Sequence, residues 1–425
     1  MKLVLLGLNE INFDYVEKYI ASGISLPNFK KLLDRKIIKT FSESKYENLE
    51  PWIQWPSIYL GKTFDEHKIF RLGDIVNSSE PQIFEVIENA GFKVGAISPM
   101  NAKNNLKNPE YFIPDPWTKT PPDDVFLRKK FSSSVSRLVN NNSESKISFK
   151  DFLYIFISII FYVRFKKYFH FFSLAFSSLI YPWRRALFLD LLLNEIHLKL
   201  LKSKKPNFSN IFLNGGAHIQ HHYFFNSKVV DSLNSNPSWY VKKNKDPLAE
   251  MLFCYDEIIG TYLDNDNFEL IIATALTQTP FKNPVFYYRL KNHEKFISQF
   301  NFKFHSIHPK MSRDFSIKFS NINDRDDAFD TLSKILVNQR TPLFGILDKR
   351  EKEIFITLTY SEEIDENDYI IFGNKKLSLK KHLSFVAIKN GEHDGKGFAF
   401  FSGNVLPNDS QENFHVSEIY NVILN

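Results

Sequence analysis

The stretch Lys2–Gly23 reads KLVLLGLNEINFDYVEKYIASG. Its first part is an apolar run that stops at Asn9 and Glu10, as expected for a buried strand. Its second part carries apolar residues at helical spacing and closes on Gly23, a common residue after a helix. A helix-then-strand succession recurs in QIFEVIENAGFKVGAIS (82–98), and a long helical pattern precedes NIFLNGG (210–216). This alternation predicts an α/β fold whose mostly parallel sheet is covered by helices on both faces.

Composition narrows the classes of protein to consider. The 425 residues are 43% apolar and 24% charged, which is typical of a globular chain. The net charge of +6 is too small for a chain of this length to indicate the dense basic surface that binds nucleic acid, so no nucleic-acid partner is expected. Because Cys254 is the only cysteine, a disulfide framework and a thiolate metal cluster are excluded. A bound metal ion would need histidine, carboxylate or amide ligands.

Changes in composition and in the pattern of predicted helices and strands along the chain predict a core with two insertions. The core is expected in 1–130, 186–287 and 366–425. The first insertion, 131–185, joins a polar linker (Ser132–Ser148) to a Phe-rich helical block, and the second, 288–365, is a small α+β unit. The segment LSFVAIKNG (383–391) is expected to return to the main sheet.

The Phe-rich block Phe152–Tyr181 has two interpretations. Its two apolar halves are separated by Arg164, Lys166 and Lys167, and each falls short of the roughly 20 apolar residues of a spanning helix. The block is either a helical pair that forms a lid or a subunit contact, or a peripheral membrane attachment. The N-terminus lacks the pattern of a secretory signal, which predicts a cytoplasmic protein with membrane association as an option.

In parallel α/β sheets, ligands bind at the carboxyl ends of the strands, so the residues after each apolar run are the informative ones. Four such positions carry polar groups. They are Asn9 and Glu10; Asn214 with His218, His221 and His222; Thr277 and Gln278; and Glu392, His393 and Asp394. Their distribution indicates a site.

The segment AHIQHHYFF (Ala217–Phe225) holds three histidines. On a helix, His218 and His222 share a face and suit two ligands of one metal ion, although packed or exposed histidines are the alternative. NGEHDG, which contains His393, is either part of the same site or a solvated turn.

Three further segments have both a functional and a structural interpretation. LEPWIQWPS (Leu49–Ser57) is expected to be too irregular for a helix, and Trp52 and Trp55 either stack on a substrate or fill the core. His67 is interpreted mainly as a packing or capping residue. Arg313 either pairs with a neighbouring carboxylate or clamps an anionic group.

The order of several motifs resembles the alkaline phosphatase superfamily, in particular its phosphodiesterase/nucleotide pyrophosphatase branch. The motifs are the strand that ends at Asn9, QWPSIYLGKTFDEH (54–67), NGGAH (214–218) and the Gly-x-His that ends at His393. The resemblance implies an alkaline phosphatase-like fold and covers most of the chain outside the two insertions. It also places Gln54 at the nucleophile position and Asn9, Ala275 and Leu276 at metal-ligand positions, so one of the family's two metal sites would be lost.

From this resemblance we expect one divalent metal ion, Zn or Mn, held by His218, His393 and Asn214. Gln54, Glu10 and His222 are the expected catalytic residues. The expected substrate-binding residues are Asn9, Trp52, Trp55, Gln278 and Arg313.

The sequence leaves three functions open. The first is a divergent metal-dependent hydrolase or group transferase that acts on a phosphoester or related anionic conjugate, with surface glycan metabolism as one setting. The second is a catalytically inactive or metal-free binding protein that recognises a hydroxyl-rich ligand such as a sugar. The third is a membrane-surface transferase for lipid-linked glycans that uses the Phe-rich block. The partner is expected to be a small molecule or a glycan conjugate.

Overall fold

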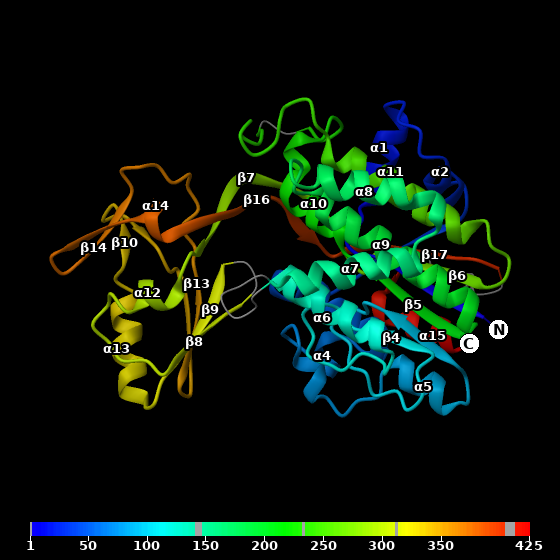
Figure 1. The fold of residues 1–425 in the computed structure, drawn as a ribbon, viewed down its shortest axis with the longest axis horizontal. Helices are drawn as coiled ribbons and strands as arrows, with labels where there is room; N and C mark the ends of the chain where they lie inside the picture. The colour runs from blue at the N-terminus through cyan, green and yellow to red at the C-terminus, as the bar shows by residue number, and fades with distance from the viewer. Residues whose placement is uncertain (1, 141–146, 232–233, 311–312, 404–412) are drawn as a thin grey trace. The chain divides into compact units, whose positions relative to one another are not determined.

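The computed structural model describes residues 2–140, 147–231, 234–310, 313–403 and 413–425. The chain forms two compact units. The first consists of Met1–Ser136, Ser148–Phe281 and Gly391–Asn425, and the second of Arg137–Ile147 and Lys282–Asn390. Figure 1 labels many of the elements of both units.

An eight-stranded sheet organises the first unit, with the strand order β18-β2-β17-β6-β1-β5-β3-β4. Every neighbouring pair is parallel except the two pairs made by β17. This sheet confirms the predicted α/β class. Its strands are β1 (Leu3–Leu8), β2 (Ile37–Phe41), β3 (Val94–Ile97), β4 (Tyr111–Ile113), β5 (Phe208–Leu213), β6 (Glu269–Ala273), β17 (Lys396–Phe401) and β18 (Asn413–His415).

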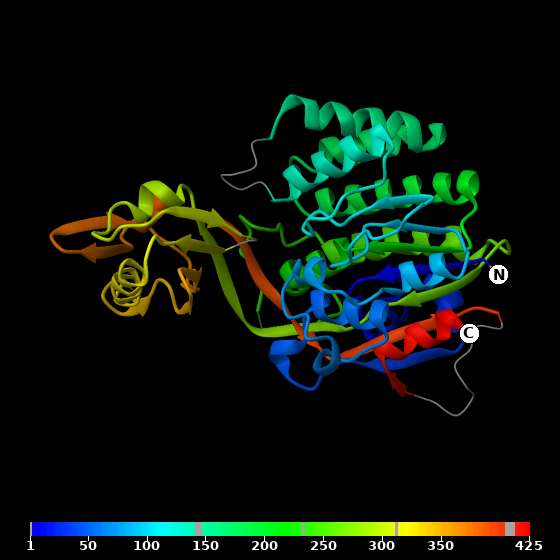
Figure 2. The ribbon, with the colours of Figure 1, turned by 90° about the horizontal axis from the view of Figure 1, so that it is seen from below.

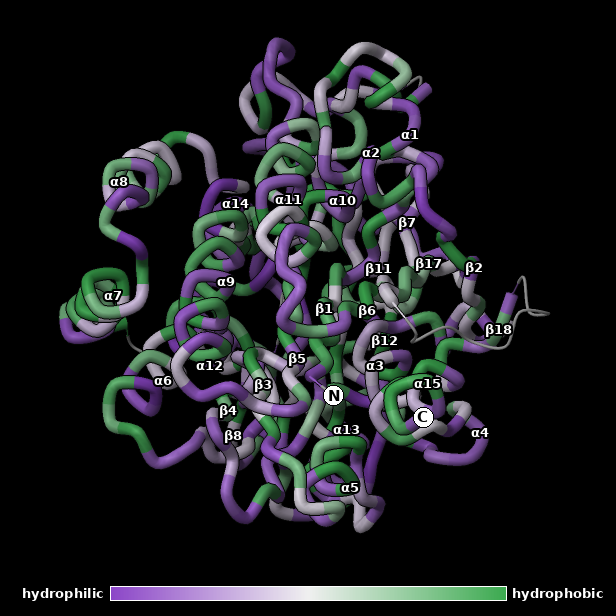
Figure 3. Tube along the Cα trace, turned by 90° about the vertical axis from the view of Figure 1, so that its right-hand side faces the viewer, coloured by the Kyte–Doolittle hydropathy of each residue, from purple (hydrophilic) through white to green (hydrophobic). Residues whose placement is uncertain are grey.

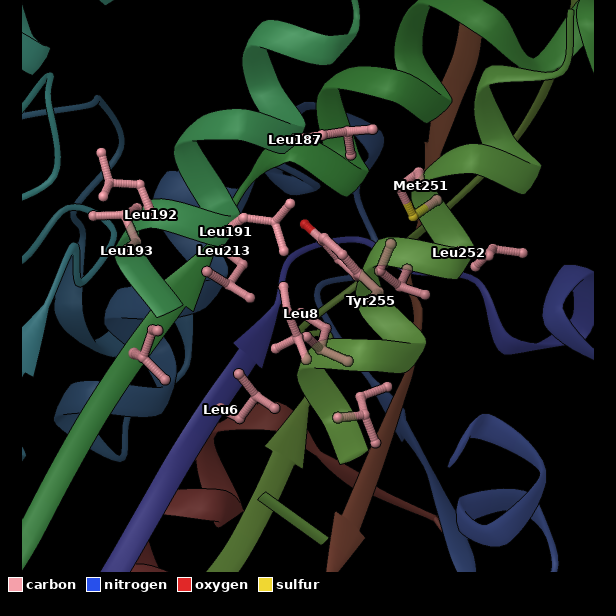
Figure 4. Close-up of a cluster of buried hydrophobic side chains, with 14 of the residues drawn as sticks. Leu6, Leu8, Leu187, Leu191, Leu192, Leu193, Leu213, Met251, Leu252 and Tyr255 are labelled. Carbon is pink, nitrogen blue, oxygen red and sulfur yellow. The ribbon is translucent and has the colours of Figure 1, made fainter. Parts of the chain in front are cut away.

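Helices cover both faces of this sheet (Figure 2). Alternate residues of β1 point to opposite faces, so Leu6 and Leu8 join one apolar cluster and Leu5 joins another. Figure 4 shows Leu6 and Leu8 facing Leu191 and Tyr255 on the covering helices. Helices on that face include α1 (Phe13–Ala21), α2 (Pro27–Leu33), α9 (Arg184–Lys204), α10 (Gly215–Tyr223) and α11 (Pro247–Leu263), and on the other face α3 (Pro51–Leu60), α5 (Ile83–Asn89) and α15 (Ile419–Leu424).

The segment expected to be irregular is helix α3. Pro51 occupies its first turn, where a missing N–H does no harm. Pro56 lies inside the helix and cannot donate to the carbonyl of Trp52, four residues earlier. The side chain of Asn101 donates to that carbonyl instead, at 2.7 Å. A residue far away in sequence therefore completes the helix.

The predicted polar linker is also partly helical. Helix α6 (Phe126–Asn140) extends into it because Phe131, Ser134 and Val135 are buried on one face. Residues 141–146 of the predicted linker lie outside the described residues. Earlier in the chain, the short helix α4 (Phe64–His67) begins with a capping box between Thr63 and Glu66.

The strand LSFVAIKNG does not return to the main sheet as expected. It belongs to β16 (Leu383–Asp394), which pairs with β7 (Thr277–Leu290) in a separate two-stranded sheet. The following strand, β17, occupies the place in the main sheet.

The second unit contains two four-stranded sheets, and its main segment, 282–390, is longer at both ends than the predicted insertion 288–365. In β9 and β13, buried residues such as Phe315, Ile317, Ile354 and Ile356 form its core. Its strands are β8 (Ser306–Pro309), β9 (Asp314–Lys318), β10 (Leu336–Val337), β11 (Thr341–Pro342), β12 (Ile346–Arg350), β13 (Glu353–Thr357), β14 (Tyr369–Phe372) and β15 (Lys375–Ser378), and its helices are α12 (His293–Ile297), α13 (Ile322–Leu332) and α14 (Leu379–His382).

The Phe-rich block forms helices α7 (Phe149–Tyr162) and α8 (Tyr168–Ser177), joined by the 3-10 turn Phe165–Lys167. Both helices pack on the outer side of α9 and carry largely hydrophobic residues (Figure 3). Among the described residues, no helix has the length and apolar character that crossing a bilayer requires.

Candidate functional site

Three side chains from distant parts of the chain converge in the first unit. Glu10 follows β1, His221 lies on α10 and His393 lies near the end of β16. The carboxylate oxygen Oε2 of Glu10 lies 3.2 Å from His221 Nε2 and 3.3 Å from His393 Nε2. The two imidazole nitrogens are 3.2 Å apart. In the part of the chain that the structure describes, these three residues form the group that can hold a metal ion.

The backbone of Glu10 adopts the left-handed conformation, with φ of 61°. For a residue other than glycine, this conformation costs about 1–2 kcal/mol. Hydrogen bonds hold it on both sides: the Glu10 N–H donates to Thr274 O at 3.1 Å, and Gln220 Nε2 donates to Glu10 O at 2.7 Å. The strained backbone directs the carboxylate toward the two histidines.

Helix α10 is positioned by the buried side chain of Asp190. Its carboxylate accepts hydrogen bonds from the N–H groups of Asn214 and Gly215 at 3.3 and 2.7 Å, and from Tyr255 OH at 2.6 Å. These bonds satisfy amide groups that a helix N-terminus otherwise leaves open. A side chain at Gly216 would meet Ile11 at 2.3 Å, so glycine permits the close approach of α10. Burial raises the pKa of Asp190 to about 6.

The Glu10 carboxylate is buried and carries a full set of hydrogen bonds. Burial alone would raise its pKa, but the positive charge of His393 and His221 and their hydrogen bonds hold it well below the usual range. Its Oε1 atom accepts from Asn9 Nδ2 at 3.0 Å, and its Oε2 atom accepts from Gln278 Nε2. Glu10 is therefore an anion at neutral pH.

An amide network adjoins the group of three. Asn9 Nδ2 also donates to Asn214 Oδ1 at 2.8 Å, and Asn9 Oδ1 accepts from Trp55 Nε1 at 2.8 Å. Both asparagines stand at strand ends, after β1 and β5. Uncharged side chains joined by hydrogen bonds therefore occupy both strand ends.

Gln54 lies on α3 and is fully buried. Its Nε2 donates to Asn48 O at 2.7 Å, while its Oε1 finds no partner among the described residues. One helical turn earlier, Glu50 Oε2 lies 3.6 Å from His393 Nδ1. The Gln54 atom without a partner among the described residues, Oε1, is a hydrogen-bond acceptor.

Ser57, the hydroxyl residue next along α3, is engaged elsewhere. Its Oγ atom lies 3.2 Å from Ile53 O and 3.0 Å from His67 Nε2. His67 Nδ1 accepts from the Ile69 N–H at 3.0 Å, so Nε2 carries the proton of the neutral ring. Burial lowers the pKa of His67 to about 4. His67 thus cannot activate Ser57 as a base.

The structure brings many of the residues selected from the sequence into one network: Asn9, Glu10, Asn214, Gln278 and His393. Trp55, which is fully buried, also joins this network because its Nε1 donates to Asn9 Oδ1. Other predicted residues lie elsewhere. Trp52 donates to Phe70 O in the first unit. Arg313 belongs to the second unit, where its guanidinium lies 4.3 Å from the centre of the Tyr287 ring.

The histidine of α10 in the group is His221, whereas His218 was expected. His218 is exposed and its ring centre lies 4.9 Å from that of His222, which in turn lies 6.0 Å from His221. A signal for His221 existed in its spacing from Asn214. The two are seven residues apart and therefore lie on one helix face, and Asn214 bonds Asn9, the neighbour of Glu10.

No protein-family model and no curated protein matches this sequence. Solved structures that match this chain include phosphonoacetate hydrolase from Sinorhizobium meliloti 1021, at 11% identity and a TM-score of 0.43 over 100% of this chain and 95% of that one. Murine ectonucleotide pyrophosphatase/phosphodiesterase 5 has 11% identity, a TM-score of 0.42 and coverage of 100% and 94%. Alkaline phosphatase from the Antarctic bacterium TAB5 has 10% identity, a TM-score of 0.41 and coverage of 100% and 97%.

Proposed function

We propose that this protein is a hydrolase of a phosphoester or related anionic conjugate that uses one divalent metal ion, Zn or Mn, held by Glu10, His221 and His393. The mutual distances of the three ligand atoms carry the proposal, since they are 3.2, 3.2 and 3.3 Å. Ligands at about 2.0–2.1 Å in a tetrahedral zinc site lie about 3.3–3.4 Å from one another. The spacing of the three atoms fits such a site.

The donor set also fits a catalytic site. Two imidazole nitrogens and one carboxylate oxygen leave a fourth position open, as catalytic zinc sites do. A metal ion bound there would lower the pKa of a water molecule and polarise a phosphoryl oxygen. The side chain of His221 is 28% exposed and that of His393 is 11% exposed, which gives a substrate a route to the group.

The surrounding residues have distinct roles in this proposal. Gln54 has no hydroxyl group, so water is the nucleophile and no covalent intermediate forms at that position. Gln54 Oε1 is available to accept a hydrogen bond from that water or from a substrate hydroxyl. Glu50 orients the His393 ring through Nδ1, in the manner of outer carboxylates around metal-bound histidines. His222, next to His221, accepts the proton of the water.

A second candidate function is a metal-free binding protein for a hydroxyl-rich ligand such as a sugar. The observation that favours it is a pair of buried amide oxygens, Oε1 of Gln54 and of Gln278, which have no partner among the described residues. Buried acceptors of this kind suit hydroxyl donors. In this case Glu10 and the two histidines would form a hydrogen-bonded ion cluster without a metal.

Metal analysis separates the two candidates. We expect the purified wild-type protein to contain about one Zn or Mn, and calorimetric titration of the metal-free protein to give a single site. His221→Ala and His393→Ala should each weaken the affinity for the metal by well over tenfold, because each removes a ligand. His218→Ala and His222→Ala are matched controls that remove a neighbouring imidazole outside the group. Wild-type protein without metal affinity, or equal losses in all four variants, would refute the metal site.

Activity is measured on chromogenic phosphodiesters and phosphomonoesters, with and without a chelator. We expect hydrolysis that the chelator abolishes and that added metal restores. In His222→Ala we expect a lower kcat with unchanged metal affinity, because this residue acts on a proton and is not a ligand. Product analysis with a sugar acceptor distinguishes a hydrolase from a transferase. Metal-independent sugar binding without hydrolysis would support the second candidate.

A further inference from the structure

Helices α7 and α8 and the turn between them, which we call the Phe-rich hairpin, expose large aromatic side chains. Phe149, Phe165 and Phe169 are 81%, 85% and 86% exposed. Phe152, Phe156 and Phe176 are exposed as well. Single exposed apolar residues are ordinary, but a contiguous set of this size on one supersecondary element marks an interaction surface.

The inner side of the hairpin is firmly attached to the first unit. Ile159, Tyr162 and Phe171 are buried in the apolar cluster of that unit. Glu195 of α9 is buried and pairs with Arg164 at 2.5 Å and with Lys167 at 3.0 Å, both in the segment between the two helices. The packing and the ion pairs on the inner side of the hairpin therefore fix its aromatic face toward the outside.

The charged residues of the segment that carries this face are mostly basic. Residues 149–205 contain ten Lys and Arg and three Asp and Glu. The three acidic residues, Asp151, Asp190 and Glu195, are all buried. Lys150 and Lys166 on the hairpin are exposed. The outer surface of this segment therefore presents aromatic rings together with positive charge.

A cavity of about 1150 Å³ adjoins the turn of the hairpin. Arg164, Lys199, Lys202 and Lys205 are among the residues that line it. Its acidic lining residues are occupied by ion pairs: Glu195 as described, Glu257 with Lys167 and Asp264 with Lys31. Positive charge thus continues from the hairpin into a cavity large enough to admit a phosphate-bearing headgroup.

We infer that the Phe-rich hairpin binds the surface of an anionic phospholipid bilayer. The exposed phenylalanines enter the boundary between headgroups and acyl chains, and Lys150, Lys166 and the lysines at the cavity contact lipid phosphates. A helix pair that is apolar on its outer face, basic around it and too short to span lies in the plane of the interface. This inference goes beyond the proposed function and does not rest on it.

The charge pattern argues against a second copy of this chain as the occupant. A self-contact through the hairpin would place two surfaces of the same positive sign against each other, without exposed acidic residues in 149–205 to offset them. Like charges opposed across an interface weaken association. An anionic bilayer offers both the apolar volume and the opposite charge.

Flotation with vesicles tests the inference. We expect the full-length protein to bind vesicles of phosphatidylcholine with 30% phosphatidylglycerol, and to bind pure phosphatidylcholine at least tenfold more weakly. Phe165→Ser/Phe169→Ser should lower the partition coefficient at least tenfold, because two exposed rings no longer enter the bilayer. Lys150→Glu and Lys166→Glu should each lower it at least about fivefold, and less so in 0.5 M NaCl.

Two variants serve as controls. Phe92→Ser removes a phenylalanine that is 50% exposed elsewhere in the first unit, and Lys36→Glu reverses an exposed charge elsewhere; neither should change the partition coefficient. Circular dichroism verifies that all variants fold. Wild-type protein that stays in the unbound fraction with both vesicle types would overturn the inference. Sedimentation that shows a dimer dissociated by Phe165→Ser/Phe169→Ser, without vesicle binding, would overturn it in favour of a second copy.

Discussion

Replacement of Asp190 by Asn should change how the stability of the protein depends on pH. Asp190 is buried, and burial raises its pKa from the usual 3.8 to about 6. Between these two values the folded protein holds a proton that the unfolded chain has released. The free energy of unfolding contributed by Asp190 therefore falls as the pH rises from about 4 to about 6.

The magnitude follows from the size of the shift. About two pKa units at about 1.4 kcal/mol each give roughly 3 kcal/mol over this range. An asparagine has no proton to release, so the variant lacks this contribution. Relative to Asp190→Asn, the unfolding free energy of the wild type should therefore fall by roughly 3 kcal/mol as the pH rises from 3.5 to 6.5.

Urea denaturation at closely spaced pH values, followed by circular dichroism, measures this difference. Asp266→Asn is a matched control because Asp266 is an exposed acidic residue, and its profile should parallel the wild type. If Asp190→Asn and wild type keep a constant difference across this range, the carboxyl does not titrate as its burial requires.

Three further predictions concern other parts of the first unit. Gly391→Ala should destabilise the protein by about 1–3 kcal/mol in chemical denaturation and weaken metal binding. The reason is that the new Cβ would lie 2.3 Å from Gln278 Oε1 and 2.8 Å from Gln220 O. Unchanged stability would contradict this prediction. Asn101→Ala should cost about 1–3 kcal/mol by leaving the Trp52 carbonyl in the proline-containing helix without its donor. Burial lowers the pKa of His197 to about 3, so below pH 6.5 the unfolded chain takes up a proton that the folded protein does not. The unfolding free energy of the wild type should therefore fall by about 3 kcal/mol relative to that of His197→Gln as the pH is lowered from 6.5 to 4. Equal acid profiles of those two proteins would refute the last prediction.

The elements that sequence predicts well are those whose pattern is local. The apolar run before Asn9 is β1, and the periodic segment after it is α1. The sequence analysis assigned Glu10 and His393 to one site, and they are in contact. The reason given was wrong for His393, because it lies on β16, which is not a strand of the main parallel sheet. The roles assigned to individual site residues stay predictions.

The elements that sequence missed depend on partners far away in the chain. The prolines of α3 argue locally against a helix, and the residue that compensates for Pro56 is Asn101, which no local rule connects to it. The choice between His218 and His221 depends on the rotation of α10 about its axis. That rotation is set by Asp190 and Tyr255 on two other helices. The partner sheet of β16 depends on β7, more than ninety residues earlier.

The asparagines beside the candidate metal centre have a consequence for any reaction there. Carboxamides neither gain nor lose protons under physiological conditions, so the wall formed by Asn9 and Asn214 keeps the same charge in acid and in base. Whatever acid or alkaline limb a rate profile shows must then originate in the imidazoles, in the carboxylates of Glu10 and Glu50, in a metal-bound water molecule or in the substrate. Few titrating groups remain on that side, so the shape of such a profile can be assigned with a small number of substitutions.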